Sequence, residues 1–281
     1  MPRPGSAAGL LRALREREPA PGRVALVCAH PDDETIGAGA SLSLLPGLVL
    51  VHVTDGAPRN LADAHAAGFE TAAGYAAARR GELRAALRLG GAEAETVELG
   101  VPDQGASEAM AEIARRLAAL FARHGIGACI THPYEGGHPD HDATAWAVAR
   151  AARAAGVETV EMLSYHAAPG GGPEGGSADG MEADRFLPGP DPVVHPDPVV
   201  HVLTPAERAR KAAMFRSFVT QSHVLAPFPL AHEAFRPAPE YDFSAPPHPG
   251  TLHYERFDWG MTGARWRTLA ARAAEEAACA A

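Results

Sequence analysis

The sequence has few cysteines, no excess of positive charge and no long hydrophobic run, and each absence excludes a class of protein. Its 281 residues include only three cysteines, Cys28, Cys129 and Cys279. Two of these lie in apolar stretches, where cysteine behaves as a small hydrophobe, so we expect a reducing compartment and no disulfides. A formal charge of −9 argues against binding to nucleic-acid phosphates, which needs a basic surface.

Export and membrane insertion find no support in the sequence either. The N-terminus carries several arginines but lacks the apolar segment and the cleavage site of a secretory signal. The most apolar window, residues 42–53, is interrupted by Pro46 and Gly47 and is too short to span a bilayer. We therefore expect a soluble, cytoplasmic protein that does not bind membranes.

Apolar strands alternate with helical segments along the first 165 residues. Alternation at this spacing gives right-handed βαβ units and a parallel sheet covered by helices on both faces. The fold class that we predict is α/β, a Rossmann-like sheet sandwiched by helices, with a loop-rich C-terminal elaboration. The expected strands are 24–29, 48–53, 95–99, 128–131, 159–165 and 199–203. The expected helices are 7–18, 35–45, 70–89, 107–123, 143–155, 205–220 and one from residue 263.

After the fifth expected strand the chain becomes irregular. Residues 169–198 are rich in glycine and proline, and such a length is uncommon inside a compact domain unless the segment covers a site. We expect it to rim the pocket together with the proline-rich stretch 227–249, whereas residues 57–68 read as a surface loop. We predict one domain over residues 1–281, with a core at about 22–222 and an extension at about 223–281.

The first expected strand ends in a cluster of charged residues at positions 30–34. A dinucleotide-binding fold has a glycine-rich turn there, and acidic side chains would repel a pyrophosphate, so that function is excluded. His30 and the carboxylates of Asp32, Asp33 and Glu34 repel or crowd one another unless a cation lies among them. A solvated helix N-cap explains one aspartate, but not two beside a histidine at a buried strand tip.

A second cluster, His138-Pro139-Asp140-His141, follows the expected strand 128–131. Open α/β sheets place their sites at the carboxyl ends of strands, so the two clusters are expected to meet. Two imidazoles and one carboxylate with an open position form the donor pattern of catalytic zinc sites, in which a bound water is acidified. Such a donor set also accepts Fe²⁺ or Co²⁺. The alternative for this cluster alone is a histidine pair at a helix start on the surface.

Taken together, residues 29–34 and 137–141 resemble the PIG-L/LmbE family of zinc-dependent N-deacetylases. Members of that family remove acetyl groups from N-acetylglucosamine units of glycolipid anchors, low-molecular-weight thiols and antibiotics. The resemblance spans about residues 24–222 and implies a hydrolase that removes an N-acetyl group from an amino sugar or its conjugate. Weaker landmarks of the family are residues 54–56, 79–83 and 218–221.

The resemblance also implies a role for residues of both clusters. Asp32 is expected to be the general base, and His138 to stabilise the oxyanion and to protonate the leaving amine. Asp140 is expected to orient His138. The residues that the resemblance gives as ligands of one Zn²⁺ per chain are His30, Asp33 and His141.

Substrate contacts follow less directly from the resemblance. Arg79 and Asp103 match positions that in relatives hold sugar hydroxyls. Some relatives have a tyrosine where this chain has Gly136, and the nearest residues that would take its place here are Tyr134 and Glu135.

Two other functions stay open. The first is an amidase acting on a larger sugar–thiol or antibiotic conjugate, and the second is a metal- or sugar-binding protein without turnover. The presence of both Asp32 and His138 argues against the second, because binding alone needs neither. The expected partner is a small-molecule amino sugar, and homo-oligomerisation is left open. His132 is an alternative pocket residue, and Tyr254 and Trp259 read as core residues with sugar stacking as the alternative.

Overall fold

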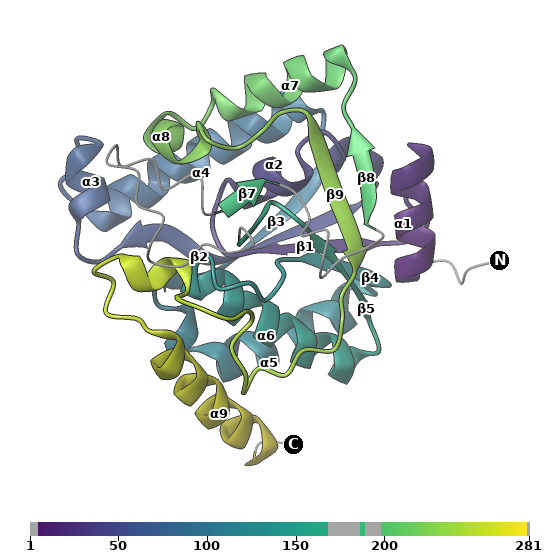
Figure 1. Ribbon diagram of the computed structural model, residues 1–281. Coiled ribbons are helices and arrows are strands. Elements are labelled where there is room, and N and C mark those ends of the chain that lie inside the picture. The colour runs from purple at the N-terminus through teal and green to yellow at the C-terminus, as the bar shows by residue number, and fades with distance from the viewer. Residues whose placement is uncertain (1–4, 168–185, 189–197, 280–281) are drawn as a thin grey trace.

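The computed structural model describes residues 5–167, 186–188 and 198–279, and a seven-stranded sheet runs through its centre (Figure 1). The strand order in this sheet is β3-β2-β1-β4-β5-β9-β8. The strands are β1 (Val24–Cys28), β2 (Leu48–Pro58), β3 (Ala94–Asp103), β4 (Ala128–Thr131), β5 (Glu158–Met162), β8 (Val199–Val202) and β9 (His232–Pro237). Two short strands, β6 (Tyr165–Ala167) and β7 (Phe186–Pro188), pair antiparallel in a sheet of their own.

Strands β1 to β5 are all parallel, which confirms the predicted Rossmann-like sheet. Leu26 of β1 lies in register with Leu50 of β2 on one side and with Ile130 of β4 on the other. The chain therefore moves outward from β1 to β3 and returns to β4 beside β1. Such a reversal of strand order opens a crevice at the carboxyl ends of the two central strands, where α/β sheets bind their ligands.

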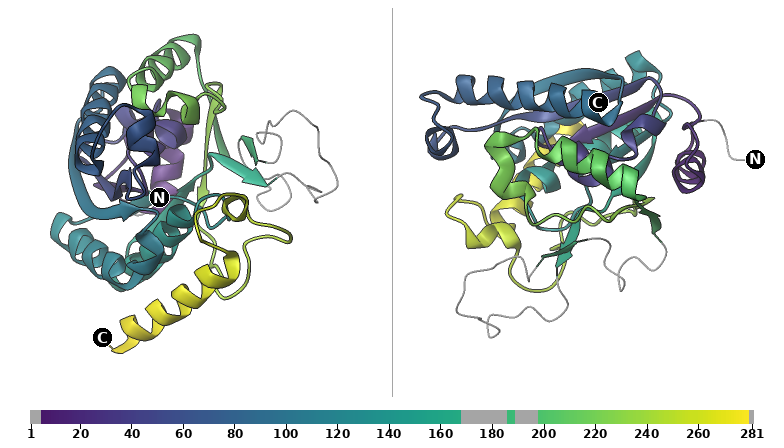
Figure 2. Two further views of the ribbon diagram at one scale, coloured as in Figure 1. Left: turned by 90° about the vertical axis from the view of Figure 1, so that its left-hand side faces the viewer. Right: turned by 90° about the horizontal axis from the view of Figure 1, so that it is seen from above.

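Helices cover both faces of the sheet, and each layer packs on its own apolar core (Figures 1 and 2). One face carries α2, α4 and α7, and the other carries α5, α6 and α9. The helices are α1 (Ala7–Glu16), α2 (Asp33–Ala38), α3 (Ala62–Ala66), α4 (Ala72–Gly90), α5 (Met110–His124), α6 (Pro139–Ala155), α7 (Pro205–Phe215), α8 (Ser222–Leu225) and α9 (Gly263–Cys279). Among these described helices, none is long and apolar enough to cross a bilayer.

Helix boundaries near the two charged clusters differ from the expected ones. Helix α6 begins at Pro139 rather than at residue 143, because His138 serves as N-cap and a proline suits the first helical position. Helix α2 begins at Asp33, two residues early, and ends at Ala38 instead of residue 45. Both charged clusters therefore lie at helix N-termini, where the helix dipole favours carboxylates.

Two further elements correct the sequence-based expectations. Helix α3 lies within residues 57–68, which read as a loop, and strand β9 lies in the proline-rich extension. A capping box formed by Thr204 and Glu207 starts α7.

A buried ion pair ties α7 and β9 to the segment around α2. The side chains of Lys211 and Glu233 are both 0 % exposed, and Lys211 Nζ lies 2.8 Å from Glu233 Oε1. The same ammonium donates to the Ile36 carbonyl at 2.8 Å. The Glu233 carboxylate also accepts the Ser41 N–H and hydroxyl at 3.1 and 2.6 Å. The packing of α7, β9 and the segment around α2 thus depends on the Lys211–Glu233 ion pair.

We expect Lys211→Met to lower the free energy of unfolding by about 3–5 kcal/mol, because it leaves the Glu233 carboxylate buried and without its cation. Urea denaturation measures this loss. The control is Arg272→Met at the exposed pair with Glu276, whose side chains are 71 % and 51 % exposed and whose loss should cost at most about 1 kcal/mol. Equal losses in the two variants would contradict a structural role for the buried pair.

Candidate active site

Both charged clusters open into one pocket of about 760 Å³ at the carboxyl ends of the central strands. A pocket of this size falls within the roughly 300–1,000 Å³ that is typical of small-molecule sites. Arg79 on α4 and Asp103 at the end of β3 also reach it. The residues that the clusters themselves contribute to its lining are His30, Asp32, Asp33, Gly137, His138 and His141.

The Asp33 carboxylate lies between two imidazoles. Its Oδ2 is 3.4 Å from His30 Nδ1, and its Oδ1 is 3.3 Å from His141 Nε2. Burial by itself would raise the pKa of Asp33, but the His141 imidazole holds it well below its usual value. An ionised carboxylate flanked by two imidazoles is a donor set that suits Zn²⁺.

His132, which directly follows β4, packs against this donor set. Its ring stacks on His141 with centroids 3.9 Å apart, and its Nε2 lies 3.2 Å from Asp33 Oδ2. The same Nε2 accepts the Ala29 N–H at 3.0 Å, so its lone pair is already engaged. From the sequence, His132 is only an alternative pocket residue, because its position after β4 does not reveal that its ring stacks on His141.

Asp32 has surroundings unlike those of its neighbour Asp33. Its φ of 142° is rare for a residue other than glycine, and such strain is typically kept at functional sites. The Asp32 N–H donates to Glu34 Oε2 at 3.0 Å, while its carboxylate accepts Arg79 Nη2–H at 2.9 Å. Burial raises the pKa of Asp32 even though Arg79 acts to lower it. The two adjacent carboxylates therefore differ both in partners and in proton affinity.

Arg79 is buried behind Asp32 and is held on several sides. Besides Asp32, its guanidinium donates to the carbonyls of Pro31 and Gly56, and its Nη1 lies 3.7 Å from Asp103 Oδ2. Burial would raise the pKa of Asp103, but His30, with Nε2 at 3.3 Å, lowers it. Both Arg79 and Asp103 face the pocket as expected, but both Nη groups of Arg79 already donate to the protein.

The absence of a Cβ atom at Gly56 leaves room for the Arg79 guanidinium. Its φ is 64°, and a Cβ atom there would lie 2.5 Å from Arg79 Nη1. We expect Gly56→Ala to displace the guanidinium and to lower kcat by up to about 10²-fold, the loss that a misplacement near 1 Å can cause. Steady-state kinetics measure this change in kcat.

The matched control for Gly56→Ala is Gly47→Ala. Gly47 has a similar φ of 66° with nothing within 4 Å of its added Cβ, so this variant carries the backbone strain without the clash. Its turnover should be unchanged. Equal losses of turnover in both variants would mean that backbone strain, and not the position of Arg79, causes the effect.

His138 is held by the first turn of α6. Its Nδ1 accepts the Asp140 N–H at 3.1 Å, so the neutral ring carries its proton on Nε2. Burial lowers the pKa of His138, and the neighbouring His30 and His141 act in the same direction. A neutral imidazole of this tautomer is a hydrogen-bond donor, whereas protonation of a leaving group needs the charged form.

The Asp140 carboxylate was expected to orient the His138 ring, but it contacts other groups. Its Oδ2 accepts the Gln104 N–H at 2.6 Å and lies 3.3 Å from His30 Nε2, and its Oδ1 accepts the Ala106 N–H at 3.0 Å. The link to His138 runs through the backbone N–H of Asp140 instead. The side chain thus fixes His30 and the loop after β3.

Tyr134 and Glu135 lie outside the described lining of the pocket. The Tyr134 ring stacks on Trp266 with centroids 5.1 Å apart, and its hydroxyl donates to the Ala245 carbonyl at 2.9 Å. At Gly136 the φ is 74° and a Cβ would lie 2.8 Å from Leu252 Cδ2. The C-terminal extension therefore occupies the space beside this position.

The extension also supplies a second wall of the pocket, of which the sequence predicted the stretch 227–249 but not the residues before it. Within the stretch expected at the rim, Pro227 and Phe228 line the pocket, whereas the segments 168–185 and 189–197 lie outside the described residues. Tyr254 is buried in the core as expected, but Trp259 faces the pocket. The lining residues from this part of the chain are Gln221, His223, Val224, Pro227, Phe228, His253, Phe257 and Trp259.

Comparisons with known proteins agree with this architecture. The profile of the PIG-L family, described as GlcNAc-PI de-N-acetylase, matches residues 25–165. The fold is similar to a triple mutant of the deacetylase Orf2 from the teicoplanin biosynthetic pathway, with a TM-score of 0.56 and 18 % identity over 79 % of this chain and 99 % of that chain. It is also similar to the A40926 pseudoaglycone deacetylase Dbv21, with a TM-score of 0.53 and 22 % identity over 73 % and 84 % of the two chains.

The same fold serves another reaction as well. The 4-carboxy-2-hydroxymuconate hydratase GalB from Pseudomonas putida KT2440 has a TM-score of 0.50 and 18 % identity, with 73 % of this chain and 82 % of that chain covered. Among curated proteins the chain has no match. Likeness to these structures therefore establishes the fold, and the reaction has to be argued from the site.

Proposed function

This chain belongs to the PIG-L family of de-N-acetylases, and from that premise we propose that it hydrolyses the N-acetyl group of an amino sugar or amino-sugar conjugate in a metal-dependent reaction. The observation that carries the proposal is the Asp33 carboxylate between His30 and His141. Asp32 and His138 line the same pocket as this group. An amide hydrolase needs a base for water and a donor for the oxyanion, and this arrangement offers both.

We assign the metal to His30, Asp33 and His141, one ion per chain. The ligand atoms of His30 and His141 lie within 4.8 Å of each other, and Asp33 offers one carboxylate oxygen to each side. When bound there, Zn²⁺ would act as a Lewis acid and lower the pKa of a coordinated water. Fe²⁺ and Co²⁺ suit the same donors, so metal analysis of the purified protein identifies the ion.

Asp32 is the general base in this proposal. Its carboxylate faces the pocket, and Arg79 holds it by a hydrogen bond of 2.9 Å that leaves the second oxygen to accept a proton. Burial raises the pKa of Asp32 and so makes its carboxylate a stronger base, while the Arg79 guanidinium favours the ionised form, as a divalent ion in the site would, so that the carboxylate can take a proton from the attacking water. It can then return that proton to the nitrogen of the leaving amine.

His138 is the donor to the oxyanion. With Nδ1 engaged by the Asp140 N–H, the neutral ring offers Nε2–H to the oxygen that gains charge. The lowered pKa of His138 favours this role over the expected role of general acid, which we assign to Asp32 instead. Asp140 keeps His30 in place through its carboxylate.

The experiment is acetate release from a panel of N-acetylated sugars, nucleotide sugars and sugar conjugates, followed together with the amine product. We expect equal amounts of acetate and free amine from at least one compound. Because a hydratase shares the fold, the panel includes an unsaturated hydroxy-tricarboxylate, whose mass would rise by one water in a hydration. Hydration without acetate release from any member would contradict the proposal, and so would tight sugar binding without any turnover.

A further inference from the structure

The pocket extends well beyond the groups proposed for catalysis, and its far wall is apolar. Its volume of about 760 Å³ is that of a site for a whole drug-sized ligand, whereas one N-acetylated sugar is considerably smaller. The far wall comes from residues outside the segment 25–165 that the family profile matches, except for one residue of α2. Its apolar members are Ile36, Val224, Pro227, Phe228, Phe257 and Trp259.

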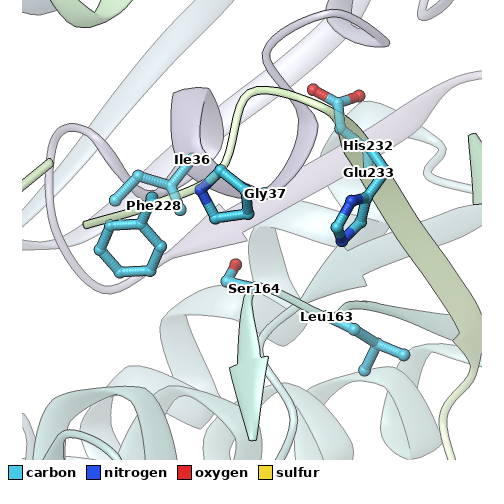
Figure 3. Close-up of a pocket in the computed structure, with 8 residues that line it drawn as sticks. Ile36, Gly37, Leu163, Ser164, Phe228, His232 and Glu233 are labelled. Atoms are coloured by element: carbon cyan, nitrogen blue, oxygen red, sulfur yellow. The ribbon is translucent and has the colours of Figure 1, made fainter. Parts of the chain in front are cut away.

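Aromatic rings of this wall begin directly beside the reaction centre. The Trp259 ring lies 4.8 Å from the His138 ring, and it stacks on Phe257 with centroids 4.5 Å apart and an interplanar angle of 16°. Figure 3 shows Phe228 beside Ile36, where a narrow side crevice opens between α2 and the end of β5. Val224 is 41 % exposed. An apolar wall left in contact with water inside a cavity is typical of a ligand site.

The charges of the pocket restrict what this ligand can be. Four carboxylates line it, those of Asp32, Asp33, Asp63 and Asp103, against one Lys or Arg among the described lining residues, Arg79. The Arg79 guanidinium is already engaged by Asp32 and the carbonyls behind it. Even a divalent ion in the site would leave the pocket without excess positive charge. A phosphate or carboxylate on the ligand would therefore be repelled.

We propose that this apolar wall is a subsite for an uncharged aromatic aglycone carried by the amino-sugar substrate. The inference rests on the proposed deacetylase function and adds the class of substrate to it. With the acetamide at His138, the stacked pair Trp259 and Phe257 offers an aromatic face to the adjoining group, and Val224 and Phe228 add apolar surface to the same pocket. Offset stacking on such faces favours a planar ring over a polar glycan.

Binding without turnover tests the subsite first. Phenyl β-glucosaminide, methyl β-glucosaminide and glucosamine 1-phosphate carry no acetyl group, so the protein cannot deacetylate them. Trp146 and Trp266 are 1 % and 0 % exposed, so quenching of tryptophan fluorescence on binding reports Trp259. We expect the phenyl compound to bind at least about tenfold more tightly than the methyl compound, because a buried ring removes more apolar surface from water. The phosphate should bind most weakly.

Turnover by a variant tests the same subsite through specificity. In Val224→Asp, kcat/KM for phenyl N-acetyl-β-glucosaminide should fall relative to that for the methyl N-acetyl compound by at least about tenfold, because the new carboxylate must lose its hydration when the ring binds. Val202→Asp on β8 is the matched control, since Val202 is 67 % exposed and lies outside the described pocket lining. That control should keep the wild-type ratio. Phe228→Ala is a second variant from the same wall, with the same expected direction.

The outcomes separate this inference from the proposed function. Equal affinities for the phenyl and methyl compounds, or tightest binding of the phosphate, would overturn the subsite whatever the activity. An unchanged specificity ratio in both Val224→Asp and Phe228→Ala would do the same. If no N-acetylated compound releases acetate while the phenyl preference persists, the proposed function fails and the subsite stands.

Discussion

Replacement of Asp32 by asparagine is expected to abolish most turnover while leaving the metal in place. Asparagine keeps the shape of the side chain and one oxygen for Arg79 Nη2–H, but it cannot take a proton from water. Loss of a general base typically lowers the rate by about 10²–10⁴-fold. Steady-state kinetics and elemental analysis on the same preparation measure both properties.

The control for Asp32→Asn is Asp242→Asn, the same chemical change at an exposed turn outside the pocket. Asp242 accepts hydrogen bonds from the Ser244 N–H and hydroxyl, both of which the amide oxygen can still accept. Its turnover should match the wild type. A fall of less than tenfold in Asp32→Asn would remove this residue from the role of base.

Asp33→Asn is expected to show the opposite pattern, with loss of metal first and loss of activity as its consequence. The neutral amide cannot balance the charge of a divalent ion between His30 and His141. Removing even a residue that only supports metal ligands costs about 10–100-fold in metal affinity, and a direct ligand should cost at least as much. Equilibrium dialysis against a buffered Zn²⁺ series measures the affinity, and excess Zn²⁺ should recover part of the activity.

A comparison of the two variants shows which of the adjacent carboxylates binds the metal and which acts as the base. The structure gives Asp33 three imidazole neighbours and gives Asp32 the Arg79 guanidinium. An empty site in Asp32→Asn together with a full site in Asp33→Asn would reverse our assignment.

The parallel sheet was predictable because its strands contain apolar runs, such as Val24–Cys28 in β1 and the start of β2. Strand β1 is buried along its whole length, and such strands belong to sheets covered on both faces. The meeting of the two charged clusters followed from the same pattern, since parallel strands end at one edge. His30 and His138 could thus be placed together, with ring centroids 4.5 Å apart in the structure, from their positions after two strands.

Strand β9 could not be predicted because tertiary contacts, and not its own sequence, stabilise it. His232–Pro237 contains only Ala234 and Phe235 as apolar residues, between the charged Glu233 and Arg236. Both charges are buried and paired with residues far away in the sequence. Without those partners a charged six-residue segment ending in proline reads as a loop.

The contacts of individual side chains could not be predicted from the sequence either. The spacing of His138 and Asp140 suggests that they touch, but the carboxylate turns toward the loop after β3 because free N–H groups of Gln104 and Ala106 lie there. The apolar wall of the pocket is built by residues such as Trp259, more than 100 positions from His138. A pattern of local spacing carries no information on such approaches.

The most direct test of the proposed site is a titration of metal-free protein with Zn²⁺ while acetate release is followed. We expect no acetate without metal and a rise that reaches its maximum at one equivalent per chain, because we assign one metal site to His30, Asp33 and His141. Full acetate release by protein shown by elemental analysis to hold no transition metal would contradict it.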